Sequence, residues 1–307
     1  MMNTTHAVTG AFSYTGKYIT QRLLTQGQRV ITLTGSANRP NPHGTEIPAY
    51  PFDFDNPEKL TASLRGVDTL YNTYWVRFDH GDKTHSRAVA NTQTLFRAAQ
   101  AAGVRRIVHV SISNPSLESN LPYFRGKAQL EQDLQNSGLS YAILRPTVIF
   151  GREDILINNI AYLLRRFPVF AVPGDGSYKL QPIYVEDMAD LAVAAGNSAE
   201  NLIWDAVGPQ IYRFAELVEQ IGAEVGARTR LMRVPPQVAL TLSQLVGVFV
   251  KDVVLTRDEV DGLMAGLLVS SETPRGQKSL EAWLHENREI VGARYASELA
   301  RHYNASK

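Results

Sequence analysis

A tyrosine and a lysine lie four residues apart at Tyr123 and Lys127, and such a pair can move a proton at neutral pH. On a helix this spacing places both side chains on one face. A neighbouring ammonium favours the phenolate, which draws the pKa of the tyrosine down from about 10 toward neutral pH. A carbonyl oxygen must gain a proton while its carbon gains a hydride, so the pair suits the acid/base step of a hydride-transfer enzyme. Because the same spacing is common on ordinary helices, the interpretation depends on the surrounding elements.

The pair is expected to begin a helix that follows a short buried strand. Residues 106–110 (RIVHV) are predicted to form the strand, and Pro122 fits the first turn of the helix. Ser111 and Ser113 directly follow the strand and would point the same way. Either hydroxyl could bind a substrate oxygen. We take Ser113 as the predicted substrate anchor, because it lies nearer the expected substrate.

A glycine-rich turn near the start of the chain joins a predicted strand, residues 6–10, to a predicted amphipathic helix, residues 17–26. Glycines let the backbone approach a pyrophosphate, and the first N–H groups of the helix face its charge. Ser13 holds the middle position of the usual three-glycine pattern, where its hydroxyl could donate to a phosphate. An ordinary strand-to-helix turn is the alternative. The predicted cofactor residues of this turn are Gly10, Phe12, Ser13, Tyr14, Thr15 and Gly16.

The end of the second predicted strand, residues 29–33, bears on the choice of dinucleotide. An acidic residue at this place would hold the ribose diol of NAD, but the next carboxylate is Glu46. The residues predicted to accept a 2′-phosphate instead are Thr34, Gly35, Ser36 and Arg39. The sequence therefore predicts NADP(H) in preference to NAD(H), although Arg39 could equally be a solvated loop residue.

Two further strands are predicted to end at the same edge of a parallel sheet, one within residues 51–55 and the other within residues 67–73. Ligands bind at that edge in such folds. Asp53 is a candidate for the adenine amine, with Phe54 beside it. Asn72 and Thr73 are candidates for a ribose or phosphate of the dinucleotide. Each residue taken singly is more often a turn or cap residue.

These segments together resemble the short-chain dehydrogenase/reductase superfamily, in its extended and atypical branches. The resemblance rests on residues 9–16 (TGAFSYTG), Asn91, and residues 110–113 (VSIS), 123–127 (YFRGK), 144–151 (LRPTVIFG), 172–176 (VPGDG) and 181–187 (QPIYVED). It covers about two-thirds of the chain. Within the superfamily, residues 149–154 (IFGRED), 180–185 (LQPIYV) and 206–209 (AVGP) are most similar to the nucleotide-binding accessory subunit of respiratory complex I and its bacterial relatives.

The resemblance implies a role for each residue of the site. Tyr123 would be the acid/base, and Lys127 would hold the nicotinamide ribose and lower the pKa of the tyrosine. A serine after the fifth strand would bind the substrate oxygen; Ser111 matches the complex I subunit, whereas Ser113 matches the sugar epimerases. The short interval between Ser113 and Tyr123 implies a reduced substrate loop. The backbone expected to face the nicotinamide carboxamide is that of Pro146, Thr147 and Val148.

Amino-acid composition further limits the classes of protein to which the chain can belong. The 307 residues suit about two domains, and 44% hydrophobic residues are ample for a large core. A formal net charge of +1 gives no global attraction to nucleic acid or acidic lipid. The absence of cysteine excludes disulfides and thiol catalysis, and the seven histidines are scattered, so we predict no metal site. No secretory or transmembrane segment is evident, which favours a cytoplasmic protein.

The predicted fold is α/β, with a Rossmann-type doubly wound parallel sheet and a smaller C-terminal α/β substrate domain. Residues 1–151 would form the dinucleotide-binding core, and residues 152–307 mainly a substrate or lid region with some elements returning to the core. In this second half helices are predicted at residues 155–166, 185–196, 214–225, 235–250 and 280–303. Residues 238–250 are the most apolar stretch. They fall short of the about twenty residues needed to cross a bilayer, and a core helix is favoured over a lid or a face against a membrane or partner.

The sequence thus predicts an NAD(P)-dependent oxidoreductase or epimerase/dehydratase of the short-chain type, acting on an unidentified small-molecule substrate. The alternative is a non-catalytic NADP(H)-binding module with a structural or redox-sensing role. Retention of the serine, Tyr123 and Lys127 favours the enzyme. Assembly into a homo-oligomer, with the terminal helix packing on another subunit, is left open.

Overall fold

Seven parallel strands form one sheet in the order β11-β6-β5-β4-β1-β2-β3. In chain order they are β1 (Thr5–Thr9), β2 (Arg29–Thr34), β3 (Ala49–Pro51), β4 (Val67–Asn72), β5 (Arg106–Val110), β6 (Ser140–Pro146) and β11 (Leu202–Ala206). The order reverses between β1 and β4, and ligands of doubly wound sheets bind at the carboxyl ends of the strands at such a reversal. The sheet confirms the predicted Rossmann-type fold.

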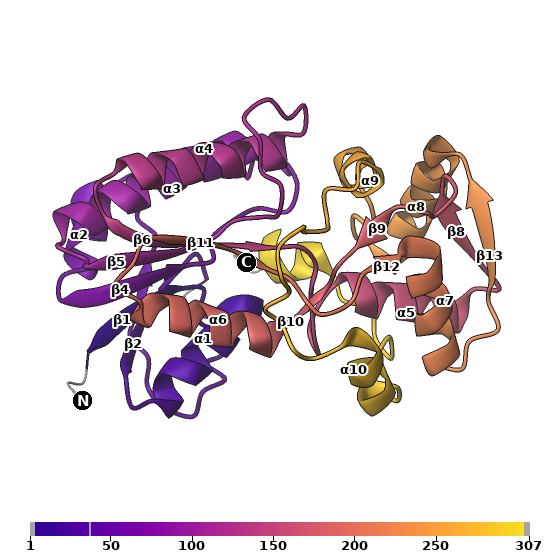
Figure 1. The fold of residues 1–307 in the computed structure, drawn as a ribbon, viewed down its shortest axis with the longest axis horizontal. Coiled ribbons are helices and arrows are strands. Elements are labelled where there is room, and N and C mark those ends of the chain that lie inside the picture. The colour runs from indigo at the N-terminus through magenta and orange to yellow at the C-terminus, as the bar shows by residue number, and fades with distance from the viewer. Residues whose placement is uncertain (1–3, 37, 304–307) are drawn as a thin grey trace. The chain divides into compact units, whose positions relative to one another are not determined.

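The computed structural model describes residues 4–36 and 38–303, which divide into two units (Figure 1). The first unit contains the chain up to Pro146 and the returning segment Val185–Ala206. The second unit contains Thr147–Tyr184 and the chain from Val207 onward. The chain therefore leaves the sheet after its sixth strand, builds part of the second unit, and comes back to add the seventh.

Helices cover both faces of the sheet (Figure 1). On one face lie α1 (Tyr14–Thr25) and α6 (Val185–Asn197), and on the other α2 (Pro57–Ser63), α3 (His85–Ala101) and α4 (Pro122–Asn136). The apolar side chains between the sheet and α2, α3 and α4 form one core. On the opposite face Arg22 of α1 donates to Asp190 at 2.5 Å and to Glu186 at 2.9 Å, which joins α1 to α6.

A buried arginine attaches the returning segment to the sheet. Arg106 of β5 is fully buried, and its guanidinium donates to the carbonyl oxygens of Ala195 at 2.9 Å and Glu200 at 2.7 Å. It also donates to Ser140 Oγ at 2.6 Å, at the start of β6. Its acceptors are thus neutral oxygens from three segments, and burial lowers its pKa. This one side chain therefore joins β5 to the start of β6 and to the segment at the end of α6.

The second unit contains short strands in three two-stranded sheets around a core of its own. The strands are β7 (Ile149–Phe150), β8 (Val169–Pro173), β9 (Lys179–Leu180), β10 (Ile183–Tyr184), β12 (Tyr212–Arg213) and β13 (Arg230–Val234). The helices are α5 (Leu156–Arg166), α7 (Phe214–Glu224), α8 (Pro236–Val250), α9 (Arg257–Met264), α10 (Leu280–Asn287) and the π-helix η1 (Leu299–Tyr303). The core gathers buried apolar residues such as Phe150, Ile157, Leu217 and Trp283.

Two predictions for this unit are wrong. Residues 280–303 do not form one helix, because α10 ends at Asn287 and only η1 follows. Gly292 has a left-handed φ of +69°, and a Cβ on it would lie 2.5 Å from the backbone of Ala161, so the chain turns tightly there. The apolar stretch 238–250 is a helix, but it is not a core helix, since α8 buries only Ala239 and Gly247.

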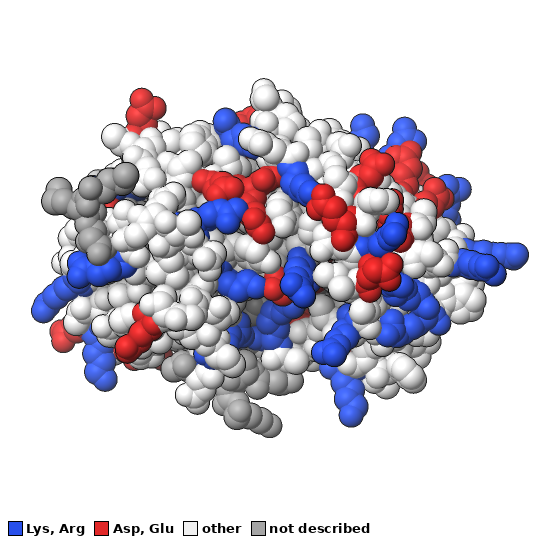
Figure 2. All heavy atoms as spheres, turned by 90° about the horizontal axis from the view of Figure 1, so that it is seen from below, with Lys and Arg blue, Asp and Glu red and all other residues white. Residues whose placement is uncertain are grey.

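Charges of both signs alternate over the surface. Figure 2 shows lysine and arginine interspersed with aspartate and glutamate on one face of the molecule. The face in this view therefore has no large field of one sign that would attract a polyanion.

Candidate functional site

The glycine-rich turn after β1 has the geometry of a phosphate-binding turn. Gly10 has a φ of +68°, and Ser13 donates both its backbone N–H (2.8 Å) and its hydroxyl (2.7 Å) to the Gly10 carbonyl. Gly16 lies so close that a Cβ on it would meet that carbonyl oxygen at 2.3 Å. The close packing of α1 on β1 depends on these glycines.

Ser13 stands at the N-cap of α1, but its side chain makes no capping bond with the helix. Its hydroxyl proton goes back to Gly10, so the serine closes the turn instead of donating to a phosphate. The oxygen can still accept. The backbone N–H groups of Tyr14, Thr15 and Gly16 form the first turn of α1, where the positive end of the helix dipole lies. Phe12 precedes this turn and is half-buried.

The segment after β2 folds back toward the glycine turn. Thr34 Oγ1 accepts the N–H of Ser36 at 3.0 Å, and the Ser36 carbonyl accepts the N–H of Arg39 at 3.1 Å. His43, which sequence reasoning missed, donates from Nε2 to the Ala11 carbonyl at 3.0 Å. A single histidine in a polar loop gives no signal of its own in the sequence. Gly35 and Arg39 complete this segment, which lies at the carboxyl end of β2.

Three aromatic rings gather at the carboxyl ends of β3 and β4. Phe52 and Phe54 stack with ring centroids 4.9 Å apart, and Tyr74 contacts both at 4.9 and 5.1 Å. Asn91 of α3 donates to the Tyr74 hydroxyl at 2.9 Å and fixes that ring. Asp53 lies between the two phenylalanines in a left-handed conformation, φ +40°, and its carbonyl accepts the N–H of Asn56. Such a cluster offers an apolar surface against which a base could stack.

The end of β4 is joined to β1 by a buried polar network. Thr73 donates its hydroxyl to the Thr9 carbonyl at 2.6 Å, and its N–H binds Thr9 Oγ1 at 2.7 Å. Asn72 is fully buried; its amide donates to His109 Nδ1 at 3.0 Å, and its oxygen accepts the Tyr74 N–H. Both ends of Asn72 are therefore engaged by protein. Thr73 is half-exposed beside Gly10. The roles of Asn72 and Thr73 toward a dinucleotide stay predictions.

Both candidate serines extend β5 along β6. Their backbone N–H groups donate to β6 carbonyls, Ser111 to Leu144 at 2.7 Å and Ser113 to Pro146 at 2.8 Å. Both side chains are buried. Within the described residues Ser111 Oγ has no hydrogen-bond partner, and a buried hydroxyl without a partner is costly unless a ligand or water satisfies it. The unpaired hydroxyl therefore favours Ser111 as the substrate anchor, whereas the sequence alone led us to prefer Ser113.

Tyr123 and Lys127 lie on one face of α4, as predicted, and two aromatic side chains surround them. The Tyr123 ring packs edge-on against Trp75 at 5.5 Å and His85 at 5.7 Å between centroids. The Lys127 Nζ donates to the Val110 carbonyl at 2.7 Å and lies 4.3 Å from the centroid of the Trp75 ring, a cation–π contact. Lys127 is only 2% exposed.

Trp75 reaches this place because α4 has a glycine there. A Cβ on Gly126 would lie 3.0 Å from the Trp75 ring, so the lack of a side chain there leaves room for the indole to lie close to the helix. The indole Nε1 is buried without a hydrogen-bond partner among the described residues. Neither Trp75 nor His85 was predicted, because Trp75 lies in the long connection after β4 and His85 begins α3 at the end of that connection.

The charge of Lys127 differs from the sequence-based expectation. Burial lowers its pKa to about 7, against the opposing attraction of the Glu131 carboxylate. Glu131 in turn accepts two bonds from Arg145. Burial, and then the charge of Lys127, hold the pKa of His109 well below its ordinary value, so this imidazole is neutral. The ammonium beside Tyr123 is thus not a fixed charge, and near neutral pH it is in exchange with the amine.

We expect stability to reveal this shifted lysine. A folded pKa below the unfolded value of about 10.4 means that the unfolded chain binds more protons, so stability rises with pH between about 7 and about 10. Lys127→Met should remove this rise, and the exposed Lys59→Met should retain it. Urea unfolding of the three proteins across this pH range measures the effect. Equal pH slopes for the wild type and Lys127→Met would contradict a buried, easily neutralised lysine.

The remaining predicted residues lie where β6 leaves the sheet. Pro146 is its last residue, and its carbonyl accepts the N–H of Ser113. Thr147 and Val148 open the second unit, where the Thr147 hydroxyl donates to the Gln181 carbonyl and the Val148 carbonyl accepts the N–H of Ile183. These two hydrogen bonds engage the Thr147 hydroxyl and the Val148 carbonyl within the second unit.

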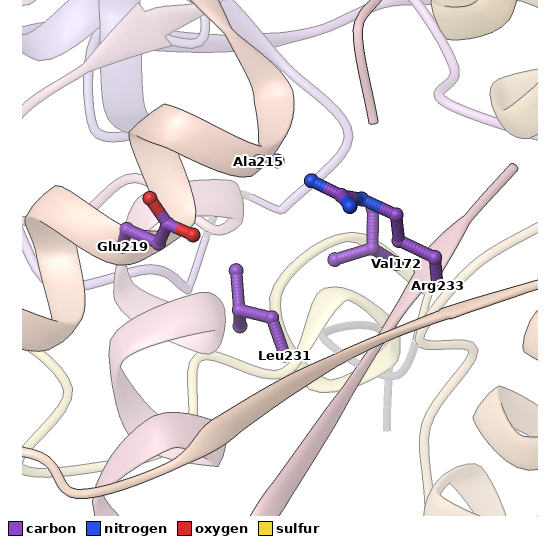
Figure 3. A pocket seen from close by; sticks show the side chains of 5 residues that line it. All are labelled: Val172, Ala215, Glu219, Leu231 and Arg233. Carbon is purple, nitrogen blue, oxygen red and sulfur yellow. The ribbon is translucent and has the colours of Figure 1, made fainter. Parts of the chain in front are cut away.

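The second unit contains a pocket of about 340 Å³ between α7, β8 and β13 (Figure 3). Glu219 and Arg233 line it from opposite sides, with Leu231 between them. None of the predicted site residues is among its lining residues. Within residues 4–36 and 38–303 there is no cluster of three or more metal-ligating side chains, and no helix of that part is long and apolar enough to cross a membrane.

Comparisons with known proteins agree with this geometry. The model of the NAD dependent epimerase/dehydratase family matches residues 6–203. The 40 kDa subunit of NADH-ubiquinone oxidoreductase from Neurospora crassa is 27% identical over 284 residues, which cover 84% of this chain and 70% of that protein. Subunit 9 of the NADH dehydrogenase 1 alpha subcomplex from Arabidopsis thaliana is 25% identical, covering 88% and 72%. These matches confirm the resemblance inferred from the sequence.

Among solved structures, an NADPH-dependent quinone oxidoreductase of Escherichia coli in complex with NADPH superposes with a TM-score of 0.73 at 18% identity. The match covers 92% of this chain and 98% of that one. A UDP-glucose 4-epimerase of Thermotoga maritima superposes with a TM-score of 0.70 at 15% identity, covering 93% and 98%. At such identities the likeness shows the fold alone.

Proposed function

Because the chain belongs to the NAD-dependent epimerase/dehydratase family, a family of the extended short-chain dehydrogenase/reductase type, we propose that it is an NADP(H)-dependent oxidoreductase that reduces a carbonyl group. One observation carries this proposal. The glycine turn after β1 and the Tyr123–Lys127 pair on α4 belong to the same edge of one sheet, the edge at which β1, β4 and β5 end. A dinucleotide held at one end by the turn could present its other end to the pair.

The residues present fit such a cofactor. A Cβ at Gly10 would collide with Ser13 Oγ inside the turn, and a Cβ at Gly16 would collide with the Gly10 carbonyl and push α1 away from β1. The first turn of α1 has no side-chain cap from Ser13, and its N–H groups suit a pyrophosphate. The ring cluster of Phe52, Phe54 and Tyr74 suits the adenine. When bound, the nicotinamide would supply the hydride.

The protein's own part in the reaction is proton transfer and orientation. As the carbonyl carbon gains a hydride, its oxygen gains a proton from the Tyr123 hydroxyl, which is left as a phenolate. The Lys127 ammonium stabilises that phenolate. The Ser111 hydroxyl, buried and without a partner among the described residues, would donate to the same substrate oxygen. The Trp75 and His85 rings pack against the Tyr123 ring and would hold it in place for the proton transfer.

Trp75 has to move during this cycle. Lys127 Nζ is engaged by the Val110 carbonyl and covered by the indole, so a ribose hydroxyl can reach it only when the Trp75 side chain is displaced. Lys127 would then hold a ribose hydroxyl through its ammonium, and such a hydrogen bond would favour the charged form and raise the pKa of Lys127.

The covered lysine also favours a second candidate function, a module that binds NADP(H) and turns nothing over. The relatives named as subunits of NADH-ubiquinone oxidoreductase support this reading, because such a subunit would act through protein partners. An assay of NADPH oxidation with a panel of quinones and simple ketones distinguishes the two. The cytoplasmic location, the small-molecule substrate and a homo-oligomer remain proposals.

We expect NADPH to bind more tightly than NADH. No carboxylate follows β2, and Thr34, Ser36 and Arg39 form a polar turn that can accept a 2′-phosphate. Arg39→Ala should weaken NADPH binding roughly tenfold, the usual worth of one charge-assisted contact, and leave NADH binding unchanged. Calorimetric titration of both proteins with both dinucleotides tests this. Equal affinities of the wild type would refute the preference, and an unaltered ratio in Arg39→Ala would assign the contact elsewhere.

A further inference from the structure

Helix α8 exposes its large apolar side chains and buries its small ones. The exposed fractions are 64% for Leu245, 81% for Val248 and 82% for Phe249, and Val238 and Leu242 are also exposed. Only Ala239 and Gly247 are buried. Gly247 lies so close to the next turn of the chain that a Cβ would meet the Asp252 carbonyl at 2.7 Å. Small residues thus let α8 pack closely, and the large side chains are left facing outward, which is unusual for a water-exposed helix.

Two of the four polar residues of α8 bond to the helix itself, whereas Gln237 and Gln244 are exposed. The Thr241 hydroxyl donates to the Gln237 carbonyl at 3.0 Å, and the Ser243 hydroxyl donates to the Leu240 carbonyl at 2.8 Å. Both hydroxyl protons are therefore satisfied inside the helix, which lowers the cost of removing them from water. The helix contains no charged residue. With fifteen residues it is too short to cross a bilayer.

Basic residues lie before and after α8 in the chain. Arg230 and Arg233 precede the helix on β13, and Lys251 caps its C-terminus in a left-handed conformation; all three are exposed. Hydrogen bonds from Ser177, and then the charge of Arg233, lower the pKa of the exposed Asp175 carboxylate, so one of these cations has an acidic neighbour. The acidic residue next to the lysine, Asp252, is buried and accepts the N–H groups of Glu298 and Leu299 at 2.8 and 2.9 Å. Its carboxylate is therefore turned inward, and the exposed charges that flank the apolar face match a layer of phosphate headgroups.

We propose that α8 is a membrane-docking helix that lies in the plane of an anionic lipid surface. Leu245, Val248 and Phe249 enter the boundary between headgroups and acyl chains, and the flanking cations bind lipid phosphates. Because the formal net charge of the chain is only +1, this attraction is local to α8. The inference concerns the second unit only and does not depend on the proposed oxidoreductase activity.

Sedimentation with lipid vesicles tests the proposal on the full chain. The wild type should bind vesicles of phosphatidylcholine mixed with phosphatidylglycerol, and bind vesicles of pure phosphatidylcholine more weakly. Phe249→Asp should lower binding to the mixed vesicles roughly tenfold or more, through lost apolar burial and added repulsion. Lys251→Glu should weaken binding to the mixed vesicles and leave binding to pure phosphatidylcholine nearly unchanged.

Ile211→Asp is the matched control, since Ile211 is an exposed apolar residue of the same unit outside α8; it should bind as the wild type does. Thermal unfolding should be the same for Phe249→Asp and the wild type, because the side chain is exposed. The proposal is overturned if the wild type ignores both vesicles, or if Phe249→Asp and Ile211→Asp bind equally. It is also overturned if the wild type is a dimer that Phe249→Asp converts to a monomer without any lipid binding, because α8 would then cover a second copy.

Discussion

Gly10→Val is expected to abolish dinucleotide binding, with a loss of roughly a hundredfold or more in affinity. Gly10 has a φ of +68°, a conformation that a β-branched residue adopts only with strain, and its Cβ would lie 2.5 Å from Ser13 Oγ. The valine side chain would also stand where the backbone must approach the pyrophosphate. Calorimetric titration with NADPH measures the loss, and circular dichroism checks that the sheet is retained.

Ser13→Gly is the control for this change. It alters the same turn, but it removes a side chain whose hydroxyl is bonded to the Gly10 carbonyl and restores the usual three-glycine pattern. We therefore expect NADPH affinity to stay the same or to rise. If Gly10→Val binds NADPH normally while the protein is folded, the dinucleotide does not occupy this turn. If Ser13→Gly loses binding, the serine holds the turn in shape and the glycine pattern alone is insufficient.

Tyr123→Phe is expected to cut turnover by roughly a hundredfold or more, the usual worth of a positioned acid/base, while NADPH affinity and folding stay unchanged. The phenylalanine ring can keep the edge-on contacts with Trp75 and His85, so the effect isolates the hydroxyl. Lys127→Met should reduce both turnover and NADPH affinity, because the lysine is proposed to serve the ribose as well as the phenol. Steady-state kinetics and titration on the same preparations separate these effects.

The same variant distinguishes the two candidate functions. For a non-catalytic module, no carbonyl compound consumes NADPH in the wild type, and Tyr123→Phe changes only stability or the binding of a partner. For an enzyme, Trp75→Phe provides a further comparison, because a smaller ring uncovers Lys127 and should raise the NADPH affinity. An active protein whose rate survives Tyr123→Phe would contradict both readings and place the proton donor on another residue.

The sheet and the glycine turn could be predicted because their signals are local. Short apolar strands, the turn around Gly10 and the helical spacing of Tyr123 and Lys127 each lie within one segment of the sequence. The carboxyl ends of parallel strands meet at one edge, so these local signals were enough to assemble the outline of a site. The structure confirms the fold, and the roles of the site residues remain predictions.

The features that escaped prediction depend on contacts between distant segments. Trp75 covers Lys127 only because Gly126 makes room for it, and no spacing in the sequence reveals such a pair. The bond between the Asn72 amide and His109 depends on the register of β4 and β5, which the sequence does not reveal. The apolar run in α8 has the same composition as a core helix, and only the packing of Gly247 decides which side faces outward.

The return of the chain to the sheet has a consequence for how the protein is made. A fragment ending at Pro146 would contain every strand of the sheet except β11, and β6 would then present an unpaired edge. Arg106 would also lose the carbonyls of Ala195 and Glu200, leaving a buried guanidinium partly unsatisfied. On the ribosome the sheet is completed only after Ala206 has been synthesised. A nascent chain halted before that point should therefore aggregate. Expression of the fragment that ends at Pro146 should likewise give insoluble protein.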